Sequence, residues 1–490
     1  RCRTIVETEI LRFGHSILGW RQVPVDISVI GAKANETRPE IEQILIGRGD
    51  PRLDNREFEK QLYILRRRME KAAIAENIAE FYVCSLSCRS LIYKGMFLAE
   101  HLSAFYPDLP YNVQKSFEPV SQVSGGSTIV MVSTAALPNP FALWRGGSLP
   151  EAVVAYETWG RLNTERSNAI LLFTGLSPSA HAASNADNSD PGWWEKMIGP
   201  GRAIDTDQWF VMCVNSLGSC FGSTGPASVD PRTGELYRLT FPVLSLEDVA
   251  RGGYEVLKHL GVRRLKATVG PSMGGMTALA FEILFPGMSD AFVSMSSGPR
   301  SLPFAIALRS LQREMIRKDP AWNNGNYPRD SVPLTGMRLA RKLGMITYRS
   351  AEEWRLRFGR ERASNTDTSG DQFGQTFEIE AYLEHHANKF TGQFDPNCYL
   401  YLSRASDLFD VAEHGSTIEA GLCKLQVERA LVIGVSTDFL FPIHQQRELA
   451  EGLESPGRDV TFVELDSLQG HDSFLVDMDR YRPLIAEFFA

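Results

Sequence analysis

The chain has 490 residues, of which 43% are hydrophobic and 22% charged, and its formal net charge is −8. This length exceeds what one hydrophobic core usually serves, so we expect two units or one domain with a large insertion. The composition is that of an ordinary globular protein. The negative charge argues against a surface for nucleic acid or anionic membranes, and no apolar run is long enough to span a bilayer.

Residues 1–5 carry no apolar stretch, so a signal peptide is not expected. The seven cysteines are odd in number and irregularly spaced, which predicts free thiols and a reducing cytoplasm rather than a disulfide framework. Cys84 and Cys88 have the spacing of half a zinc site, but no second pair of ligands follows them. We therefore interpret them as ordinary thiols and predict no metal site.

The composition changes near residue 125 and predicts two parts. Residues 111–139 include a stretch dominated by Ser, Gly, Thr, Ala and Pro, which is typical of a linker. Before it, residues 1–110 hold one predicted helix and two predicted strands, at 56–80, 81–87 and 90–93. We expect a partial α+β segment there, and a separate domain over residues 140–490.

In this second part short apolar runs alternate with amphipathic segments. The runs predict strands at 152–156, 168–173, 209–214, 265–270, 290–295, 430–435 and 459–464. The segments at 246–259 and 275–285 predict helices between them. This alternation indicates an α/β fold with a mostly parallel sheet that is covered on both faces.

Residues 298–427 interrupt the alternation and predict a helical lid. The helical patterns lie at 304–317, 377–386 and 398–412. We expect this insertion to lie over the carboxyl-terminal edge of the sheet, where open α/β sheets bind ligands. A lid in that position would shield the site from water.

The segment Gly270-Pro271-Ser272-Met273-Gly274 has the form G-x-S-x-G and lies between a predicted strand and a predicted helix. In that context the motif is a sharp turn that lifts the serine hydroxyl clear of the sheet. We therefore predict Ser272 as a nucleophile in an α/β-hydrolase-type fold. Without its context the motif would carry little weight.

An acid and a histidine follow Ser272 in the order that such a site requires. Asp438 and His471 each lie just past a predicted strand, so both reach the edge that carries Ser272. His471 would accept the serine proton and return it to the leaving group, and Asp438 would hold the imidazole in the needed tautomer. A helix-capping aspartate and a surface-loop histidine are the structural alternatives.

An oxyanion formed at Ser272 would need two backbone N–H groups. The residue after the nucleophile, Met273, supplies one, and a loop after an early strand should supply the other. Leu176 is the candidate donor, in the loop Gly175-Leu176-Ser177-Pro178 that follows the strand ending at Phe173. The alternative is an ordinary turn.

Residues 140–490 resemble the homoserine/serine O-acyltransferase family of α/β-hydrolase-fold enzymes. The matching segments are LWRGG (143–147), AYETWG (155–160), DTDQWF (205–210), NSLGSC (215–220), GSTGP (222–226), LQR (311–313), DFLFP (438–442) and GHDSFL (470–475). The resemblance implies that Ser272 takes an acyl group from acyl-CoA and passes it to the hydroxyl of a small amino acid, with no bound cofactor. It also implies a homodimer.

The family pattern places substrate contacts at Arg313 and Asp472. A guanidinium suits a carboxylate and a carboxylate suits an ammonium group, so the pair would fit a zwitterionic acceptor. Acetyl-transferring members carry Asn where this chain has Arg309, one helical turn before Arg313. A second guanidinium there could bind the distal carboxylate of a succinyl group. The loop 175–178 also resembles the serine O-succinyltransferase branch.

The resemblance therefore implies succinyl-CoA as donor and L-serine as acceptor, in cysteine biosynthesis. Three alternatives stay open: a homoserine O-acetyl- or O-succinyltransferase of methionine biosynthesis, using acetyl-CoA or succinyl-CoA; an esterase; and a non-catalytic scaffold with a hydrolase fold. Serine and homoserine differ by one methylene, and a pocket discriminates such a difference by only about 1–3 kcal/mol of free energy.

Residues 1–110 resemble an interior fragment of the glutaminase domain of glutamate synthase. The resemblance rests on LGWRQVPVD (18–26), YKGM (93–96) and FYPDL (105–109). That domain needs an N-terminal cysteine nucleophile, whereas this sequence opens on Arg1 and Cys2 does not lie in the expected motif. We expect this segment to be catalytically silent.

Overall fold

The computed structural model describes residues 133–328, 332–363 and 372–490. The chain divides into two units, Arg1–Gly126 and Ser127–Ala490. The predictions for residues 1–110, for most of the linker and for Cys84 and Cys88 lie outside the described residues. The described residues all belong to the second unit.

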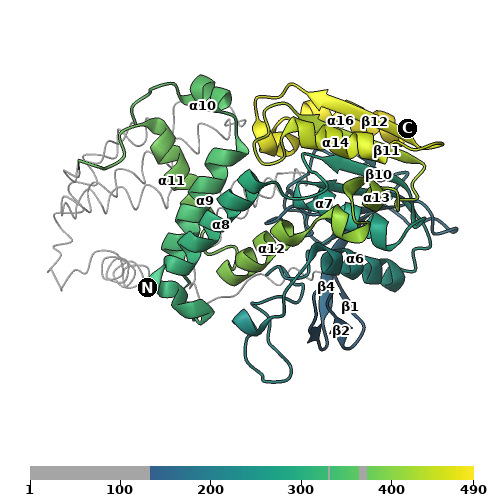
Figure 1. The fold of residues 1–490 in the computed structure, drawn as a ribbon, viewed down its shortest axis with the longest axis horizontal. Helices are drawn as coiled ribbons and strands as arrows, with labels where there is room; N and C mark the ends of the chain where they lie inside the picture. Colours follow the sequence, from purple (N-terminus) through teal and green to yellow (C-terminus); the bar gives the residue numbers. More distant parts are fainter. Residues whose placement is uncertain (1–132, 329–331, 364–371) are drawn as a thin grey trace, which may run out of the picture. The chain divides into compact units, whose positions relative to one another are not determined.

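An eight-stranded sheet forms the centre of this unit (Figure 1). Its strands, in spatial order, are β1 (Ser133–Ala136), β4 (Val153–Trp159), β8 (Phe210–Val214), β5 (Ala169–Phe173), β9 (Leu265–Pro271), β10 (Ser289–Met295), β11 (Arg429–Val435) and β12 (Asp459–Leu465). The pairs β1–β4 and β4–β8 are antiparallel, and the other neighbours are parallel. The seven predicted strands and the mostly parallel sheet are therefore present.

Two small sheets accompany the large one. They pair β2 (Phe141–Ala142) with β3 (Ser148–Leu149), and β6 (Ile198–Gly199) with β7 (Ile204–Asp205). The α-helices are α6 (Leu246–Leu260), α7 (Met273–Leu284), α8 (Pro303–Lys318), α9 (Leu334–Tyr348), α10 (Ala351–Phe358), α11 (Glu378–Phe390), α12 (Pro396–Leu408), α13 (Ile418–Leu422), α14 (Ile443–Leu453), α15 (Ser473–Val476) and α16 (Met478–Phe489). None of these helices is both long and apolar enough to cross a membrane.

The central strands β5, β8, β9, β10 and β11 are buried on both faces, which explains why they are mostly apolar runs. In β5, Leu171 and Phe173 belong to one core cluster, whereas Ile170 and Leu172 belong to the other. This alternation follows from the two-residue period of a strand. Residues of α6 and α7 complete the first cluster, and residues of α16 complete the second.

Helix α6 shows how local sequence fixes an element next to the sheet. Ser245 caps its first turn by accepting a hydrogen bond from the Asp248 N–H, and Asp248 accepts one from the Ser245 N–H in return. At the other end Gly261 adopts φ 68°, a left-handed conformation that suits glycine and stops the helix. The capping box and the glycine therefore bracket the predicted helix.

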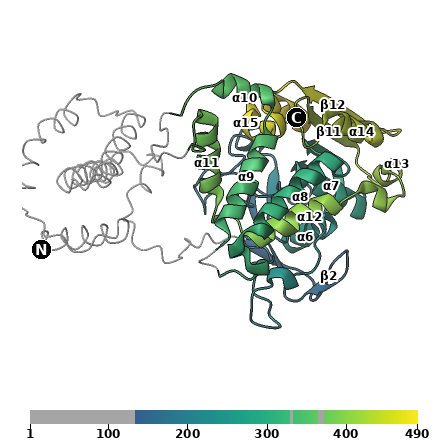
Figure 2. The ribbon, with the colours of Figure 1, turned by 60° about the vertical axis from the view of Figure 1, so that its left-hand side comes forward.

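Between β10 and β11 the chain forms the helices α8 to α13, and α9 lies between α8 and α11 (Figures 1 and 2). The predicted helices 304–317 and 377–386 correspond to α8 and α11. The predicted helix 398–412 is wrong at its end, because α12 stops at Leu408 and Phe409 turns to an extended conformation. Helices α9 and α10 were not predicted.

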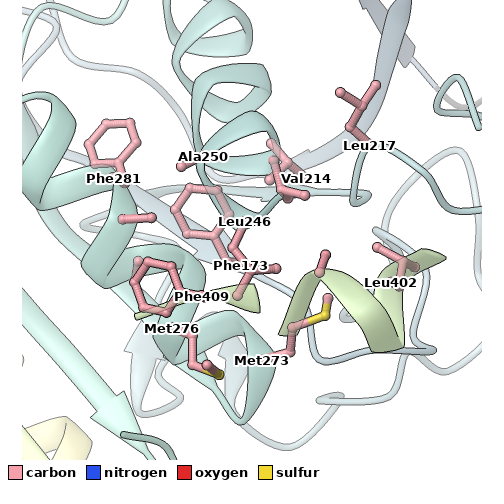
Figure 3. Close-up of a cluster of buried hydrophobic side chains, with 14 of the residues drawn as sticks. Phe173, Val214, Leu217, Leu246, Ala250, Met273, Met276, Phe281, Leu402 and Phe409 are labelled. Carbon is pink, nitrogen blue, oxygen red and sulfur yellow. The ribbon is translucent and has the colours of Figure 1, made fainter. Parts of the chain in front are cut away.

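The end of α12 has a packing reason. Phe409 is buried, and with Leu402 of α12 it joins the core cluster that contains Phe173, Leu246 and Phe281 (Figure 3). Asp410 then pairs with Arg300 in an isolated antiparallel bridge. Burial of the Phe409 ring thus holds the inserted helices against the α/β core.

Candidate active site

Ser272 stands at the turn between β9 and α7, with φ 54° and ψ −126°. A positive φ is costly for a residue other than glycine, and strained residues of this kind cluster at active sites. The glycines of the motif make the turn possible. A Cβ at Gly270 would collide with the backbone of Gly274, and one at Gly274 would collide with the carbonyl oxygen of Phe173. The motif therefore needs glycine at both positions.

The structure brings Ser272, His471 and Asp438 together. The Nε2 atom of His471 lies 2.7 Å from Oγ of Ser272, and its Nδ1 atom lies 2.9 Å from Oδ2 of Asp438. The other carboxylate oxygen of Asp438 accepts hydrogen bonds from the N–H groups of Leu440 and Phe441, at 2.8 and 3.0 Å. Asp438 is thus fixed in place and can hold the His471 ring with Nε2 toward the serine.

The surroundings of His471 favour its proton-accepting role. Burial alone would lower the pKa of His471, but the charge of Asp438 and their hydrogen bond outweigh it, so the pKa is raised above 6.5. The rings of Phe441 and Phe474 pack against the imidazole, with centroids 5.6 and 5.9 Å away. A base of raised pKa at 2.7 Å from the hydroxyl fits general base catalysis.

Both predicted oxyanion donors lie at the same cavity as Ser272. Leu176 and Met273 line this cavity, and so do Gly175, Ser177 and Pro178. Within the described part of the chain, neither the Leu176 N–H nor the Met273 N–H has a hydrogen-bond partner. Two unpaired N–H groups beside the hydroxyl are what a developing oxyanion requires.

The cavity measures about 130 Å³ and has charged walls. Arg309 and Asp472, both predicted to contact the substrates, line it, but Arg313 does not. Burial raises the pKa of Asp472, and the charges of Arg349, His471 and Arg341 oppose that shift. A guanidinium and a carboxylate therefore face the space next to the nucleophile.

Arg313 supports Arg309 rather than facing the cavity. The buried carboxylate of Asp407 bridges the two, with Oδ1 2.6 Å from Nε of Arg309 and Oδ2 2.7 Å from Nη2 of Arg313. Arg309 also donates to Oγ of Ser301, and Arg313 donates to Oγ of Ser403 at 2.8 Å. This network holds the Arg309 side chain in one orientation at the cavity wall.

Sequence reasoning missed Arg341, Tyr348 and Tyr399, which also line the cavity. Arg341 and Tyr348 belong to α9, the inserted helix that was not predicted. The only signal for Arg341 was the basic pattern Arg338, Arg341 and Lys342, which by itself indicates an exposed helix face. Among the described residues, no group of His, Cys, Asp and Glu side chains could hold a metal ion.

A serine, a histidine and an aspartate joined in this order at the ends of parallel strands define an enzyme of the α/β-hydrolase class. The family model of the alpha/beta hydrolase fold matches residues 168–477, and that of class-II glutamine amidotransferases matches residues 1–120. The predicted fold class of the second part and the resemblance of the first part are thus confirmed.

Curated relatives are similar to nearly the whole second part. The serine O-succinyltransferase of Stenotrophomonas maltophilia (strain K279a) is 58% identical over 354 residues, which cover 72% of this chain and 96% of that protein. The serine O-succinyltransferase of Frateuria aurantia is 57% identical over 355 residues, covering 72% and 97%. The chain belongs to the homoserine/serine O-acyltransferase family, and both of these relatives are named serine O-succinyltransferases.

Solved structures agree on the fold and differ in their activities. Homoserine O-acetyltransferase from Bacillus anthracis has a TM-score of 0.67 at 29% identity, over 73% of this chain and 96% of that one. Esterase E22 has a TM-score of 0.67 at 30% identity, over 73% of this chain and 99% of that one. Proteins with this fold thus include both an acyltransferase and an esterase.

Proposed function

We infer that the second part of the chain transfers a succinyl group from succinyl-CoA to the hydroxyl of L-serine, through an acyl-Ser272 intermediate. The observation that carries this is the Ser272–His471–Asp438 arrangement, which opens into a cavity with Arg309 and Asp472 in its walls. The names and the 57–58% identity of two relatives support succinyl-CoA and L-serine. As an activity of cysteine biosynthesis it fits a cytoplasmic enzyme, and the family resemblance favours a homodimer.

In the first half-reaction His471 takes the proton of Ser272 at Nε2, and Oγ attacks the thioester carbonyl. The carbonyl oxygen becomes an oxyanion facing the N–H groups of Leu176 and Met273. When the intermediate collapses, the carbon–sulfur bond breaks and His471 gives its proton to the CoA sulfur. Free CoA leaves, and the succinyl group stays on Ser272 as an ester.

In the second half-reaction the serine substrate enters the same cavity. His471 removes the proton of its hydroxyl, and that oxygen attacks the ester carbonyl of Ser272. When the intermediate collapses, the bond between the acyl carbon and Oγ of Ser272 breaks, His471 returns the proton to Oγ, and O-succinylserine leaves. Asp472 is the candidate partner for the ammonium group of the acceptor, because it lines the cavity next to His471.

Arg309 is our candidate for the distal carboxylate of the succinyl group. It is the member of the Arg309–Asp407–Arg313 network that lines the cavity. We therefore propose Arg313 as a positioning residue that acts through Asp407, in place of the direct substrate contact expected from the sequence. A fixed guanidinium binds a carboxylate by two parallel hydrogen bonds.

A competition assay tests the proposed function. Purified protein is given serine and homoserine together, with succinyl-CoA or acetyl-CoA, and the O-acylated products are separated by mass. We expect O-succinylserine to form fastest. Faster acylation of homoserine, or faster transfer from acetyl-CoA, would replace the proposal with the homoserine acyltransferase alternative.

Arg309→Ala should remove the preference for succinyl-CoA over acetyl-CoA. Loss of a charge-assisted contact to the succinyl carboxylate should lower kcat/KM for succinyl-CoA by about tenfold to a hundredfold, while kcat/KM for acetyl-CoA changes little. Lys318→Ala, at an exposed position of the same helix, is the control. Equal losses with both donors would show that Arg309 only stabilises the lid.

The esterase alternative draws on the likeness to esterase E22. Both activities begin with the same acyl-Ser272, and they differ in whether water or an amino acid accepts the acyl group. Hydrolysis of succinyl-CoA without serine, at a rate that added serine leaves unchanged, would identify an esterase. We expect serine to divert the acyl group almost completely.

A further inference from the structure

A second cavity of about 330 Å³ lies among the inserted helices α9, α10 and α11. Its lining combines cationic and aromatic side chains, of which Arg341, Arg349, Lys389, Trp354, Tyr382 and Phe390 matter here. The volume falls in the range of small-molecule sites. The mechanism above makes no use of this cavity.

Three cations, Arg341, Arg349 and Lys389, and one carboxylate, Asp472, line the cavity, so its lining carries an excess of positive charge. Lys389 is exposed and forms no ion pair within the described ranges. Arg341 lies over the ring of Phe390, with 4.5 Å from Cζ to the centroid, and its buried Nε has no hydrogen-bond partner among the residues that the structure describes. Arg349 forms the ion contacts with carboxylates, at 3.6 Å from Asp472 and 3.9 Å from Glu353, and the charge of Arg341 also acts on Asp472.

His386 also lines the cavity, and the neighbouring positive charges add to the effect of burial on it. Its pKa is lowered, first by desolvation and then by the neighbouring charges of His385, Lys389, Arg357 and Arg341. The part of this shift that comes from the cations reports a local positive potential, which favours an anion. The unpaired cations therefore indicate a site for a negatively charged ligand.

The aromatic side chains narrow the class of anion. The rings of Trp354 and Tyr382 lie 6.0 Å apart at an edge-on angle of 66°, and the Arg357 guanidinium lies 4.4 Å from the centroid of the Tyr382 ring. Flat apolar faces beside cations suit a ligand that has both a planar base and phosphates, because bases stack on aromatic rings while Lys and Arg bind phosphates.

The second cavity adjoins the catalytic one. Arg341 and Asp472 line both, and Asp472 directly follows His471 in the chain. A ligand with an extended middle part could therefore place one end among α9, α10 and α11 and the other end at Ser272. A CoA thioester has this form, with a phosphorylated adenosine at one end and the reacting sulfur at the other.

We propose that the cavity among α9, α10 and α11 binds the phosphorylated adenosine end of the acyl-CoA donor. Lys389 and Arg341 contact the phosphates, and Trp354 offers a face to the adenine. The acyl-pantetheine arm then passes Arg341 and Asp472 to reach Ser272. This inference rests on the proposed acyl-CoA-dependent function and adds to it the place where the nucleotide is held.

Calorimetric titration of the full chain with adenosine 3′,5′-bisphosphate tests the site without any turnover. Lys389→Glu should weaken its binding by about tenfold, because a charge-assisted contact becomes a repulsion. Trp354→Leu should weaken it as well, through loss of stacking. Lys424→Glu makes the same charge change at an exposed lysine that does not line the cavity, and it should bind like the unaltered protein.

A kinetic comparison separates this site from the catalytic one. For Lys389→Glu we expect a raised KM for succinyl-CoA at unchanged kcat, and no change with succinyl-pantetheine, which lacks the nucleotide. Equal binding of the bisphosphate by Lys389→Glu and Lys424→Glu would overturn the proposed site, even if serine is succinylated. Binding that depends on Lys389 in a protein that transfers no succinyl group would keep the site and overturn the proposed function alone.

Discussion

Ser272→Ala should lower kcat/KM for acyl transfer by a factor on the order of 10⁴ to 10⁶ and abolish the acyl adduct. Oγ of Ser272 is the atom that bonds to the acyl carbon, so no neighbouring group can replace it. In the unaltered protein, succinyl-CoA without serine should leave a succinyl group on the peptide that contains Ser272. Mass spectrometry of the quenched reaction measures both the adduct and its position.

A matched control exists for the backbone strain at this position. Ser416 is exposed and, like Ser272, has a positive φ, of 72° against 54°. Ser416→Ala therefore removes a hydroxyl from another residue of positive φ, far along the chain from the nucleophile, and it should keep full activity. Both variants should unfold thermally close to the unaltered protein, since serine and alanine share the Cβ that a positive φ disfavours.

Two outcomes would contradict the nucleophile assignment. An adduct that persists in Ser272→Ala would place the acyl group on another residue. If the unaltered protein forms no adduct from any acyl-CoA, the non-catalytic scaffold becomes the better interpretation of the fold.

The catalytic triad could be predicted from the sequence because its members follow strand ends. The strands β9 and β11 are mostly apolar and β12 alternates polar and apolar residues, and parallel strands deliver the residues after them to one edge. Ser272, Asp438 and His471 are thus set by local pattern and chain order. The two oxyanion donors could be predicted for the same reason. Leu176 follows β5 of the same sheet, and Met273 is the residue after Ser272.

The cavity walls could not be predicted in the same way. Arg309 and Arg313 share a helix face because they are four residues apart, but the sequence does not say how far α8 is shifted along its axis relative to Ser272. Four residues correspond to about 6 Å of rise, enough to move one guanidinium to the cavity and the other behind it. Asp407 and Phe409, which fix that shift, come from a distant part of the chain.

The same reason explains the unpredicted helices between β10 and β11. Helix α9 contains Gly336 and Gly344, which weaken a helical pattern in the sequence. In the structure each glycine allows a close approach, since a Cβ at Gly336 would meet the backbone of Met315 and one at Gly344 would meet the side chain of Gln312. Both contacts pack α9 against α8, so tertiary packing determines this helix.

Asp438→Asn should lower kcat/KM by about 10⁴-fold with little change in the fold. The carbonyl oxygen of the introduced amide can still accept the hydrogen bonds from the N–H groups of Leu440 and Phe441, which one carboxylate oxygen of Asp438 accepts in the unaltered protein. The amide NH₂ must then face Nδ1 of His471. An N–H donor there forces the ring to keep its proton on Nε2, where it can no longer accept the Ser272 proton.

The pH dependence distinguishes this electrostatic role from a structural one. His471 acts as a base in its neutral form, so activity falls as pH drops through its pKa, which Asp438 helps to raise above 6.5. In Asp438→Asn the charge that raises this pKa is gone and desolvation still lowers it. The acidic limb of the pH profile of kcat/KM should therefore move to lower pH. At high pH kcat/KM should stay below that of the unaltered protein, because neutral His471 keeps its proton on Nε2. Asp459→Asn, at an exposed residue that begins β12, is the control. It should leave both the value of kcat/KM and the position of its acidic limb unchanged. An acidic limb that stays in place in Asp438→Asn would mean that Asp438 does not set the titration of His471.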